Sequence, residues 1–228
     1  MARGTPAFLG KPVSVPRAPP RRLPGAKPTG AEWKRAEVLA GRTAGTAIGD
    51  AAAADTPLRV VVGFSVEDQI ESNWCWAALS LALIKKYGGH QMRRQCEIVK
   101  EAFPHLSPCA DSSSANHMLE LSGSLRYFGM RNGESVAGQV GREKIVEQIE
   151  AQQPVCVRVR SDLRPAGHVI AISGYQIIDG EMYVQVEDPA ENGGASNTRG
   201  PFPFATLQTR YFGEATEWNR TYFTKPPA

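Results

Sequence analysis

The longest apolar run of the chain has helical length and lies at residues 74–87. Its first eleven letters, WCWAALSLALI, are apolar on nearly every side of a helix, which predicts a buried helix at the centre of a domain. Ser72 or Asn73 is placed to cap the start of this helix. Gly88 and Gly89 supply a left-handed stop after it.

The rest of the pattern places helices first and strands afterwards. Helical spacing recurs at residues 93–103, 113–128 and 141–152. Runs typical of strands occur at residues 58–64, 155–160, 168–178 and 181–188, and a short helix near 205–212 precedes a strand at 217–224. This order, with little alternation, indicates an α+β fold in which a central helix packs on an antiparallel sheet.

The N-terminal region has a different composition from the rest of the chain. Residues 1–30 contain seven prolines and six Lys or Arg, and no acidic residue precedes Glu32. Such a segment has too little apolar side chain to offset the entropy of ordering it. The Ala, Gly and Thr-rich stretch that follows resembles a linker, with a short helix at residues 33–39. We therefore expect residues 1–57 to be a disordered leader or linker and residues 58–228 to form one domain.

Charge and hydropathy limit the classes of partner. The net charge of +3 is carried largely by the leader, so we treat it as a solvated arm and expect no nucleic-acid partner. No apolar run reaches the length of about 18 residues that a membrane span needs. The basic start is not followed by a secretory signal pattern. We therefore expect the protein to be released by another route or to stay in the cytoplasm.

Four cysteines are too few for a disulfide-built scaffold at this length. Cys156 alternates with valines in PVCVRV and is most simply a core residue. Cys96 and Cys109 could pair with each other, or could lie near His105 and His117 as metal ligands. Their spacing matches no zinc pattern, so we expect no metal site, but the sequence leaves both alternatives open.

Cys75 has the setting that a nucleophile needs. It falls in the first turn of the central helix, where the helix dipole and free backbone N–H groups favour a thiolate and can hold an oxyanion. Gln69, six residues earlier, could bring a side-chain amide to the same point. His168 follows a glycine at the mouth of an apolar strand and is the best-placed base. Asp188 ends the partner strand, where its carboxylate could orient the imidazole.

The hairpin that joins His168 to Asp188 must satisfy a geometric condition. A two-residue turn at residues 179–180 would put Ala171 opposite Asp188 and leave His168 on the other face of the sheet. A three-residue loop at residues 178–180 shifts the register by one and brings the two side chains to the same face. We predict this bulged loop or an equivalent bulge elsewhere in the hairpin.

These segments resemble the papain-like cysteine peptidases of clan CA. The resemblance rests on QIESNWCWAA, AGHVIAISGY and EDPAENGG, and it covers about residues 58–224. Its form is most similar to a bacterial branch that includes effector proteases of plant pathogens and is related to peptidases that trim double-glycine leaders. It implies a papain-like fold, a protein or peptide substrate and no cofactor. It also implies Cys75 as nucleophile, His168 as general base and acid, Asp188 as orienting residue and Gln69 as oxyanion donor.

The resemblance extends to the cleft and the leader with less detail. Trp74 and Trp76 flank the nucleophile and, with Gly167, are the candidates to line a substrate cleft, although tryptophans more often serve packing. The Gly-Ser lead-in of papain is absent, so its subsite preferences do not transfer. Relatives can cut their own N-terminal region, and TPAFLG at residues 5–10 loosely resembles such a site, which suggests a contact between leader and domain.

Two other functions remain open at this stage. A transglutaminase-type enzyme uses the same acyl chemistry and also has a Cys-Trp followed by His and Asp, but Gln69 favours hydrolysis by a papain-type site. A papain-fold adaptor would keep the architecture without the reaction, and the complete set of site residues argues against that reading.

Overall fold

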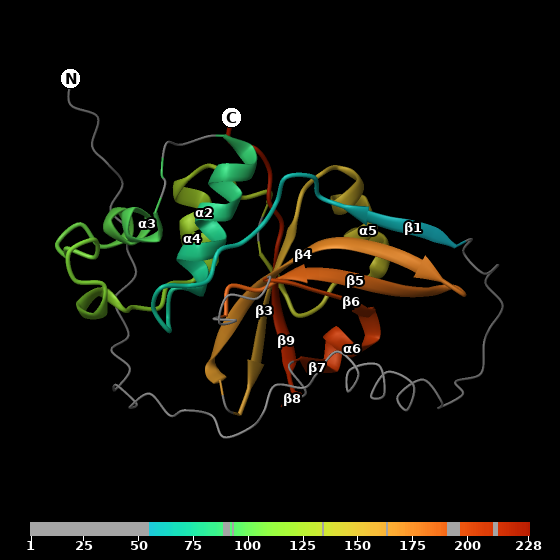
Figure 1. The fold of residues 1–228 in the computed structure, drawn as a ribbon. Helices are drawn as coiled ribbons and strands as arrows, with labels where there is room; N and C mark the ends of the chain where they lie inside the picture. Colours follow the sequence, from blue (N-terminus) through green and yellow to red (C-terminus); the bar gives the residue numbers. More distant parts are fainter. Residues whose placement is uncertain are drawn as a thin grey trace.

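Helices and strands form two distinct parts of the chain (Figure 1). The computed structural model describes residues 55–88, 92, 94–133, 135–162, 164–190, 197–211 and 214–228. Its helices are α2 (Cys75–Tyr87), α3 (Gln95–Ala102), the 3-10 turn η1 (Ser113–Ala115), α4 (Leu121–Tyr127), α5 (Arg142–Glu150) and α6 (Phe204–Thr209). Its strands are β1 (Thr56–Val60), β2 (Val136–Ala137), β3 (Val155–Ser161), β4 (Arg164–Ile178), β5 (Glu181–Glu187), β6 (Thr198–Pro203), β7 (Arg210–Tyr211), β8 (Glu214–Ala215) and β9 (Glu217–Tyr222). Nearly all of the expected leader, including residues 5–10, lies outside the described residues.

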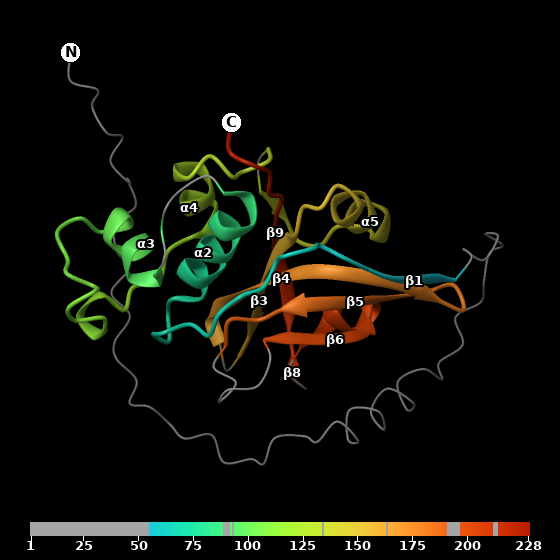
Figure 2. The same cartoon turned by 45° about the horizontal axis from the view of Figure 1, so that its top comes forward.

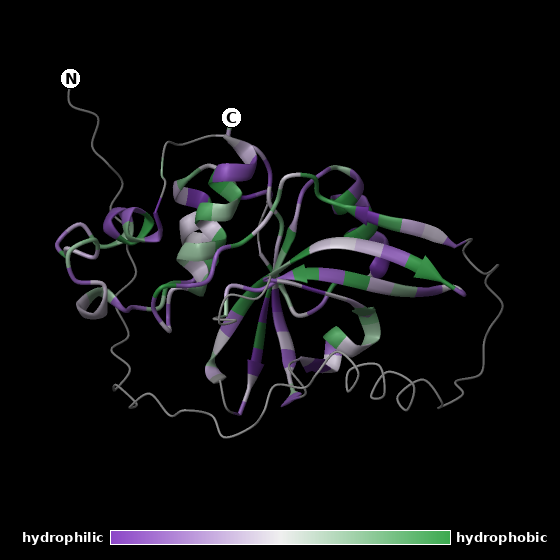
Figure 3. Ribbon diagram, viewed as in Figure 1, coloured by the Kyte–Doolittle hydropathy of each residue, from purple (hydrophilic) through white to green (hydrophobic). Residues whose placement is uncertain are grey.

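The architecture is α+β, as the order of elements predicts. One sheet has the strand order β2-β9-β3-β4-β5-β6, and β1 pairs with the last part of β4. Every pairing in this sheet is antiparallel. Helices α2, α3 and α4 gather on one side of the molecule, and the sheet with α5 and α6 makes up the other (Figures 1 and 2). Apolar and polar residues alternate along β5, where Met182, Val184 and Val186 are buried, so this strand has a core face (Figure 3).

Helix α2 is the buried central helix that the apolar run predicts. Its residues from Cys75 to Ile84 are all buried. Gly88 ends the helix in the left-handed conformation, with φ of 70°, and donates its N–H to the Ile84 carbonyl. The predicted side-chain cap is wrong, because the N-cap is Trp74 and Asn73 instead bonds to Asn116. No described helix is both long and apolar enough to cross a membrane.

The helical pattern at residues 113–128 is interrupted by the tryptophans of the central helix. The indole N–H of Trp74 donates to the Ala115 carbonyl at 3.0 Å, and that of Trp76 donates to the His117 carbonyl at 3.0 Å. The Ala115 carbonyl also accepts the backbone N–H of His117 at 2.7 Å, a contact two residues along the chain and not the four-residue contact of an α-helix. The segment therefore divides into η1 and α4, with an extended stretch between them.

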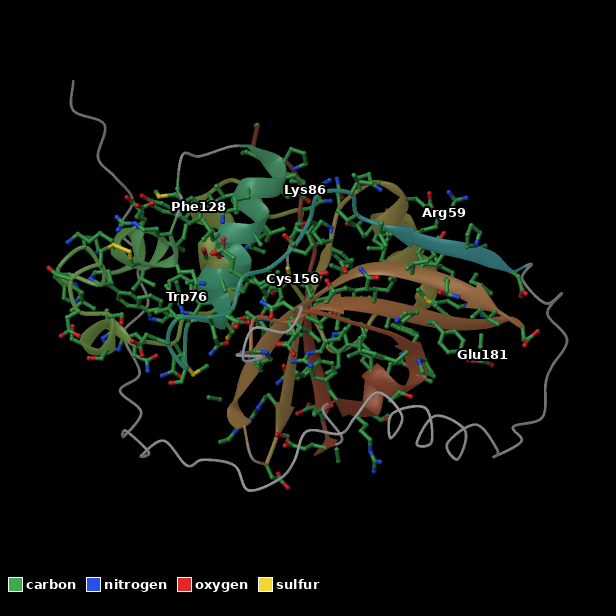
Figure 4. The ribbon with its side chains drawn as sticks, in the orientation of Figure 1. Arg59, Trp76, Lys86, Phe128, Cys156 and Glu181 are labelled. Carbon is green, nitrogen blue, oxygen red and sulfur yellow. A yellow bond between two sulfur atoms is a disulfide. The ribbon has the colours of Figure 1, made fainter. Side chains whose placement is uncertain are left out.

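Cys96 and Cys109 form a disulfide between α3 and the loop that follows it, visible as the yellow bond beside α3 in Figure 4. The bond removes both sulfurs as metal ligands, so the metal alternative for this pair is wrong. Among the described residues, no cluster of three or more His, Cys, Asp or Glu side chains is arranged to hold a metal ion.

Loss of the disulfide is expected to destabilise the domain. The bond closes a loop with a sequence separation of 13, for which the chain-entropy estimate is about 3 kcal/mol. The double variant Cys96→Ser/Cys109→Ser should unfold at lower denaturant concentration by about that free energy. A thiol reductant should lower the wild-type midpoint to the same value and leave the variant unchanged. A wild-type midpoint that ignores the reductant would contradict the prediction.

Candidate active site

Cys75 is the first residue of α2, at the end of the helix that meets β4. Its side chain is 6% exposed and lies within hydrogen-bonding reach of His168. The backbone N–H groups of Trp76 and Val169 also donate to its sulfur. A helix start thus carries the sulfur, and the adjoining strand carries the imidazole.

His168 and Asp188 meet inside the protein. Nε2 of His168 lies 2.7 Å from Oδ1 of Asp188, and both side chains are buried. Because Nε2 contacts the carboxylate, the other ring nitrogen, Nδ1, is the one available to Cys75. The structure therefore brings three of the sequence-predicted site residues into one hydrogen-bonded chain.

A bulge in the β4–β5 hairpin creates this alignment. Ile178 faces Glu181 across a two-residue turn, so the expected three-residue loop is wrong. The register then shifts between Ile172 and Gly174, which leaves Ser173 as the extra residue. The predicted equivalent bulge elsewhere in the hairpin is therefore present. The Ser173 carbonyl accepts the backbone N–H of Val61 at 2.8 Å, so the extra peptide is not left unpaired.

The bulge puts His168 and Asp188 on one face of the hairpin. Beyond it Ala171 pairs with Glu187, and extending this register by one residue sets Ile170 across from Asp188. His168, two residues before Ile170, then lies diagonal to Asp188 on the same face. Without the bulge the carboxylate would point to the opposite face of the sheet.

The three side chains shift one another's ionisation. Burial alone would raise the pKa of Cys75, but the hydrogen bond and charge of His168, with the N–H groups of Val169 and Trp76, lower it. Burial alone would lower the pKa of His168, but the charge and hydrogen bond of Asp188, helped by Cys75, raise it to about 9. Burial opposes ionisation of Asp188 as well, yet His168 outweighs it and the pKa of Asp188 falls. The shifts of Cys75 and His168 thus both favour the thiolate–imidazolium pair over the neutral pair.

Gln69 lies close to the site but directs its amide into the loop before α2. Its Nε2 donates to the carbonyls of Glu71 at 3.0 Å and Ser72 at 2.8 Å, which uses both amide hydrogens. Its buried Oε1 has no partner among the described residues. Its backbone N–H donates to the Pro189 carbonyl at 2.7 Å and so ties this loop to the segment after Asp188.

The three residues expected to line the cleft have backbone and packing roles in the structure. Trp74 is fully buried and Trp76 is 1% exposed, so their indoles support the start of α2 and offer almost no surface to a substrate. Gly167 has φ of 85°, a conformation that favours glycine, and a Cβ there would lie 3.1 Å from Arg158 carbons. The sequence identified the neighbourhood of the nucleophile, but it did not separate packing from contact with substrate.

Asp188 also contacts two side chains that the sequence did not predict to be near it. Arg199 and Tyr211 both bond its second carboxylate oxygen. The sequence pattern places Tyr211 in a short helix and Arg199 in no element, and no spacing pattern connects either to Asp188. The other free cysteine, Cys156, is fully buried and burial raises its pKa to about 12, as expected for a core residue.

Comparison with known proteins identifies the class to which this site belongs. A helix-borne cysteine beside a strand-borne histidine and a buried aspartate is the arrangement of a cysteine peptidase. The model of the Peptidase_C39 like family matches residues 61–219, and the chain belongs to this family. Membership implies cysteine peptidase activity, and the matched range includes every candidate site residue. No curated protein matches the chain.

Proposed function

We propose that the chain hydrolyses peptide bonds with Cys75 as nucleophile, His168 as general acid and base, and Asp188 as orienting residue. The observation that carries this proposal is the hydrogen-bonded chain from Cys75 through His168 to Asp188 at the start of a buried helix, in a member of a peptidase family. A papain-like mechanism is the finer assignment, and it rests on this geometry together with the resemblance of the motifs.

In the first half-reaction the Cys75 thiolate attacks the carbonyl carbon of the scissile bond. The π electrons move onto the carbonyl oxygen, and the Cys75 backbone N–H, in the first helical turn, donates to that oxyanion. The intermediate collapses, the C–N bond breaks, and the imidazolium of His168 gives its proton to the leaving amine. A thioester on Cys75 and a neutral imidazole remain.

The second half-reaction reverses these roles with water. Neutral His168 takes a proton from a water molecule, whose oxygen attacks the thioester carbonyl. Collapse of this second intermediate breaks the C–S bond, releases the acid and restores the Cys75 thiolate beside protonated His168. Asp188 holds the ring in one orientation through both steps.

Gln69 serves as the second oxyanion donor in this proposal, after a change in its hydrogen bonds. Both of its amide hydrogens are held by the carbonyls of Glu71 and Ser72. A bound oxyanion is a stronger acceptor than a neutral carbonyl and could draw one of these hydrogens away. This exchange would make the second donor available only when substrate occupies the site.

Labelling with a papain-type epoxide inhibitor tests the proposal directly. A single adduct on Cys75 is expected at neutral and mildly acidic pH, because His168 lowers the pKa of the thiol. Intact mass would measure it, and Cys75→Ala should give no adduct. Cys156 should stay unlabelled because it is buried and its pKa is raised. No adduct, or labelling only at Cys156, would reject the proposal and favour the adaptor reading.

The wider biology stays a prediction from the sequence. A role as a bacterial effector, release by a route without a standard signal, and cutting of the chain's own leader at residues 5–10 rest on the resemblance of motifs. The residues concerned lie outside the described part of the chain. A protein or peptide substrate follows from the proposed reaction.

A further inference from the structure

The carboxylate of Asp188 is enclosed by four hydrogen-bond donors. Oδ1 accepts from Nε2 of His168 at 2.7 Å and from the backbone N–H of Ala190 at 2.8 Å. Oδ2 accepts from the hydroxyl of Tyr211 at 2.8 Å and from Nε of Arg199 at 3.2 Å. The side chain is fully buried, so no solvent competes for either oxygen. Orienting a histidine uses only one of these oxygens, so the two hydrogen bonds to Oδ2 need another explanation.

The two donors to Oδ2 come from strands that follow Asp188 in the sequence. Arg199 lies on β6 directly across from Val186, which puts it diagonal to Asp188 on the same face. Tyr211 is 5% exposed and lies on β7, immediately after α6. Each donor is therefore held by a sheet pairing or by burial, so the Asp188 contacts do not depend on freely moving side chains.

We propose that Arg199 and Tyr211 are positioning residues that clamp Oδ2 of Asp188 and thereby keep Oδ1 on His168. This inference rests on the proposed function of Cys75 and His168. A carboxylate held at one oxygen can rotate about its terminal bond, whose torsional preference is broad. Holding both oxygens removes that freedom, so the imidazole keeps Nδ1 directed at Cys75 without an entropic cost during the reaction.

The clamp also has an electrostatic effect, because Arg199 is permanently charged and Tyr211 is neutral. The guanidinium offsets part of the negative charge of Asp188, and it is one of the groups that lower the pKa of that carboxyl. Removal of the positive charge leaves Asp188 more effective at holding a proton on His168. The pKa of His168 should then rise further above its already raised value of about 9.

Other ionisable groups near His168 stay constant when the clamp is changed. Cys75 faces it from α2, and Arg160 from β3 and Glu214 from β8 line a small cavity beside it. Arg160 donates to the Pro165 carbonyl, and Glu214 accepts from Ser161. Tyr211 lines the same cavity and pairs with Glu214 across β7 and β8, but Tyr211→Phe keeps this strand pairing and removes only the hydroxyl.

The chain provides a matched control for the clamp. Glu150 also accepts from a tyrosine, Tyr175, at 2.6 Å and has an arginine, Arg59, at 4.0 Å. Tyr175 is 5% exposed, the same as Tyr211. Tyr175→Phe and Arg59→Gln therefore remove the same chemical groups from a carboxylate outside the candidate triad.

The test uses the full chain and two measurements. The first follows the ring resonances of His168 against pH by NMR, and the second follows alkylation of Cys75 by iodoacetamide at mildly acidic pH. Arg199→Gln should move the His168 midpoint upward by about 0.5 to 1 pH unit, whereas Arg199→Lys should restore most of the wild-type midpoint. Tyr211→Phe should slow alkylation about threefold to tenfold, since Oδ2 of Asp188 loses the hydrogen bond from the Tyr211 hydroxyl.

The outcomes separate the clamp from the proposed function. Unchanged titration in Arg199→Gln, or equal slowing in Tyr211→Phe and Tyr175→Phe, would overturn the clamp while wild-type Cys75 stays reactive. A wild-type Cys75 that does not react at mildly acidic pH would instead overturn the proposed function. The NMR titration of His168 does not depend on turnover, so it would still decide whether Arg199 acts on the imidazole.

Discussion

Cys75→Ala is expected to abolish peptide hydrolysis while leaving the fold intact. The thiolate is the only group in the candidate site that can form the thioester, so its removal should lower kcat by at least about four orders of magnitude. Alanine is a better helix former than cysteine and fits the buried first turn of α2, so the helix should persist. Release of new amino groups from a degenerate peptide library would measure the loss.

Cys156→Ala is the matched control for that experiment. Cys156 is the other free cysteine among the described residues, and Figure 4 labels it where α2 meets the sheet. Cys156 is fully buried, so its substitution removes the same atom from the core and should cost about 1 kcal/mol of stability with little change in turnover. Retained hydrolysis in Cys75→Ala, or equal loss in both variants, would reject Cys75 as nucleophile.

Local patterns were enough to predict the main elements of the fold. The apolar run identified α2, and Gly88 marked its end, because burial and a left-handed stop are properties of a short segment. Strand periodicity located β3, β4, β5 and β9 for the same reason. The cap of α2 was wrong because Asn73 bonds to Asn116, 43 residues away, a contact that no local pattern contains.

The hairpin shows how function can constrain a fold prediction. Requiring His168 and Asp188 to share a face predicted a register shift, and the structure contains one. Its position was not predictable, since the extra carbonyl at Ser173 is satisfied by Val61 on a distant segment. The sequence favoured a loop bulge at residues 178–180, where Asp179 and Gly180 instead adopt positive φ in a two-residue turn.

The residues that surround the candidate triad are brought there by contacts between distant parts of the sequence. Gln69 has the expected spacing from Cys75, but spacing does not determine where its amide points. Arg199 reaches Asp188 because β6 pairs with β5, and Tyr211 reaches it from β7, which follows α6. The motif therefore indicates the reacting groups, and tertiary structure supplies the residues that hold them.

Asp188→Asn is expected to reduce activity less than Asp188→Ala. It should nevertheless remove more than one of the hydrogen bonds that Asp188 makes. The carboxylate accepts from four donors, whereas an amide has one acceptor oxygen. With that oxygen on His168, the amide nitrogen would face Tyr211, which can accept, and Arg199, which cannot. Asparagine should thus keep the ring oriented and lose Arg199, while alanine leaves every donor unpaired.

The expected size of these effects follows from the number of partners lost. Asp188→Asn should lower kcat/KM about tenfold to a hundredfold, and Asp188→Ala about a thousandfold or more. Asp188→Ala should also lower the free energy of unfolding by about 2 to 4 kcal/mol, because buried donors lose their acceptor. Peptide-library turnover and denaturant unfolding would measure the two effects. Equal loss in both variants would show that ring orientation contributes nothing.

Glu187→Gln is the control for burial of a neighbouring carboxylate. Glu187 is 2% exposed and accepts from three neutral groups in the described part of the chain: the Val66 N–H and the hydroxyls of Ser173 and Thr198. An amide oxygen can accept from the N–H, and the hydroxyls can turn to accept from the amide nitrogen. Turnover should therefore stay near the wild-type rate.

A double-mutant cycle would show whether the loss of kcat/KM in Asp188→Asn comes from the lost contact with Arg199. If Asp188→Asn already disconnects Arg199, then adding Arg199→Gln should reduce kcat/KM by less than it does in the wild-type background. The coupling follows because one carboxylate oxygen is the shared partner. Additive losses would mean that Arg199 affects activity by a route other than Asp188. A residue that acts only through the carboxylate should have no further effect once that contact is lost.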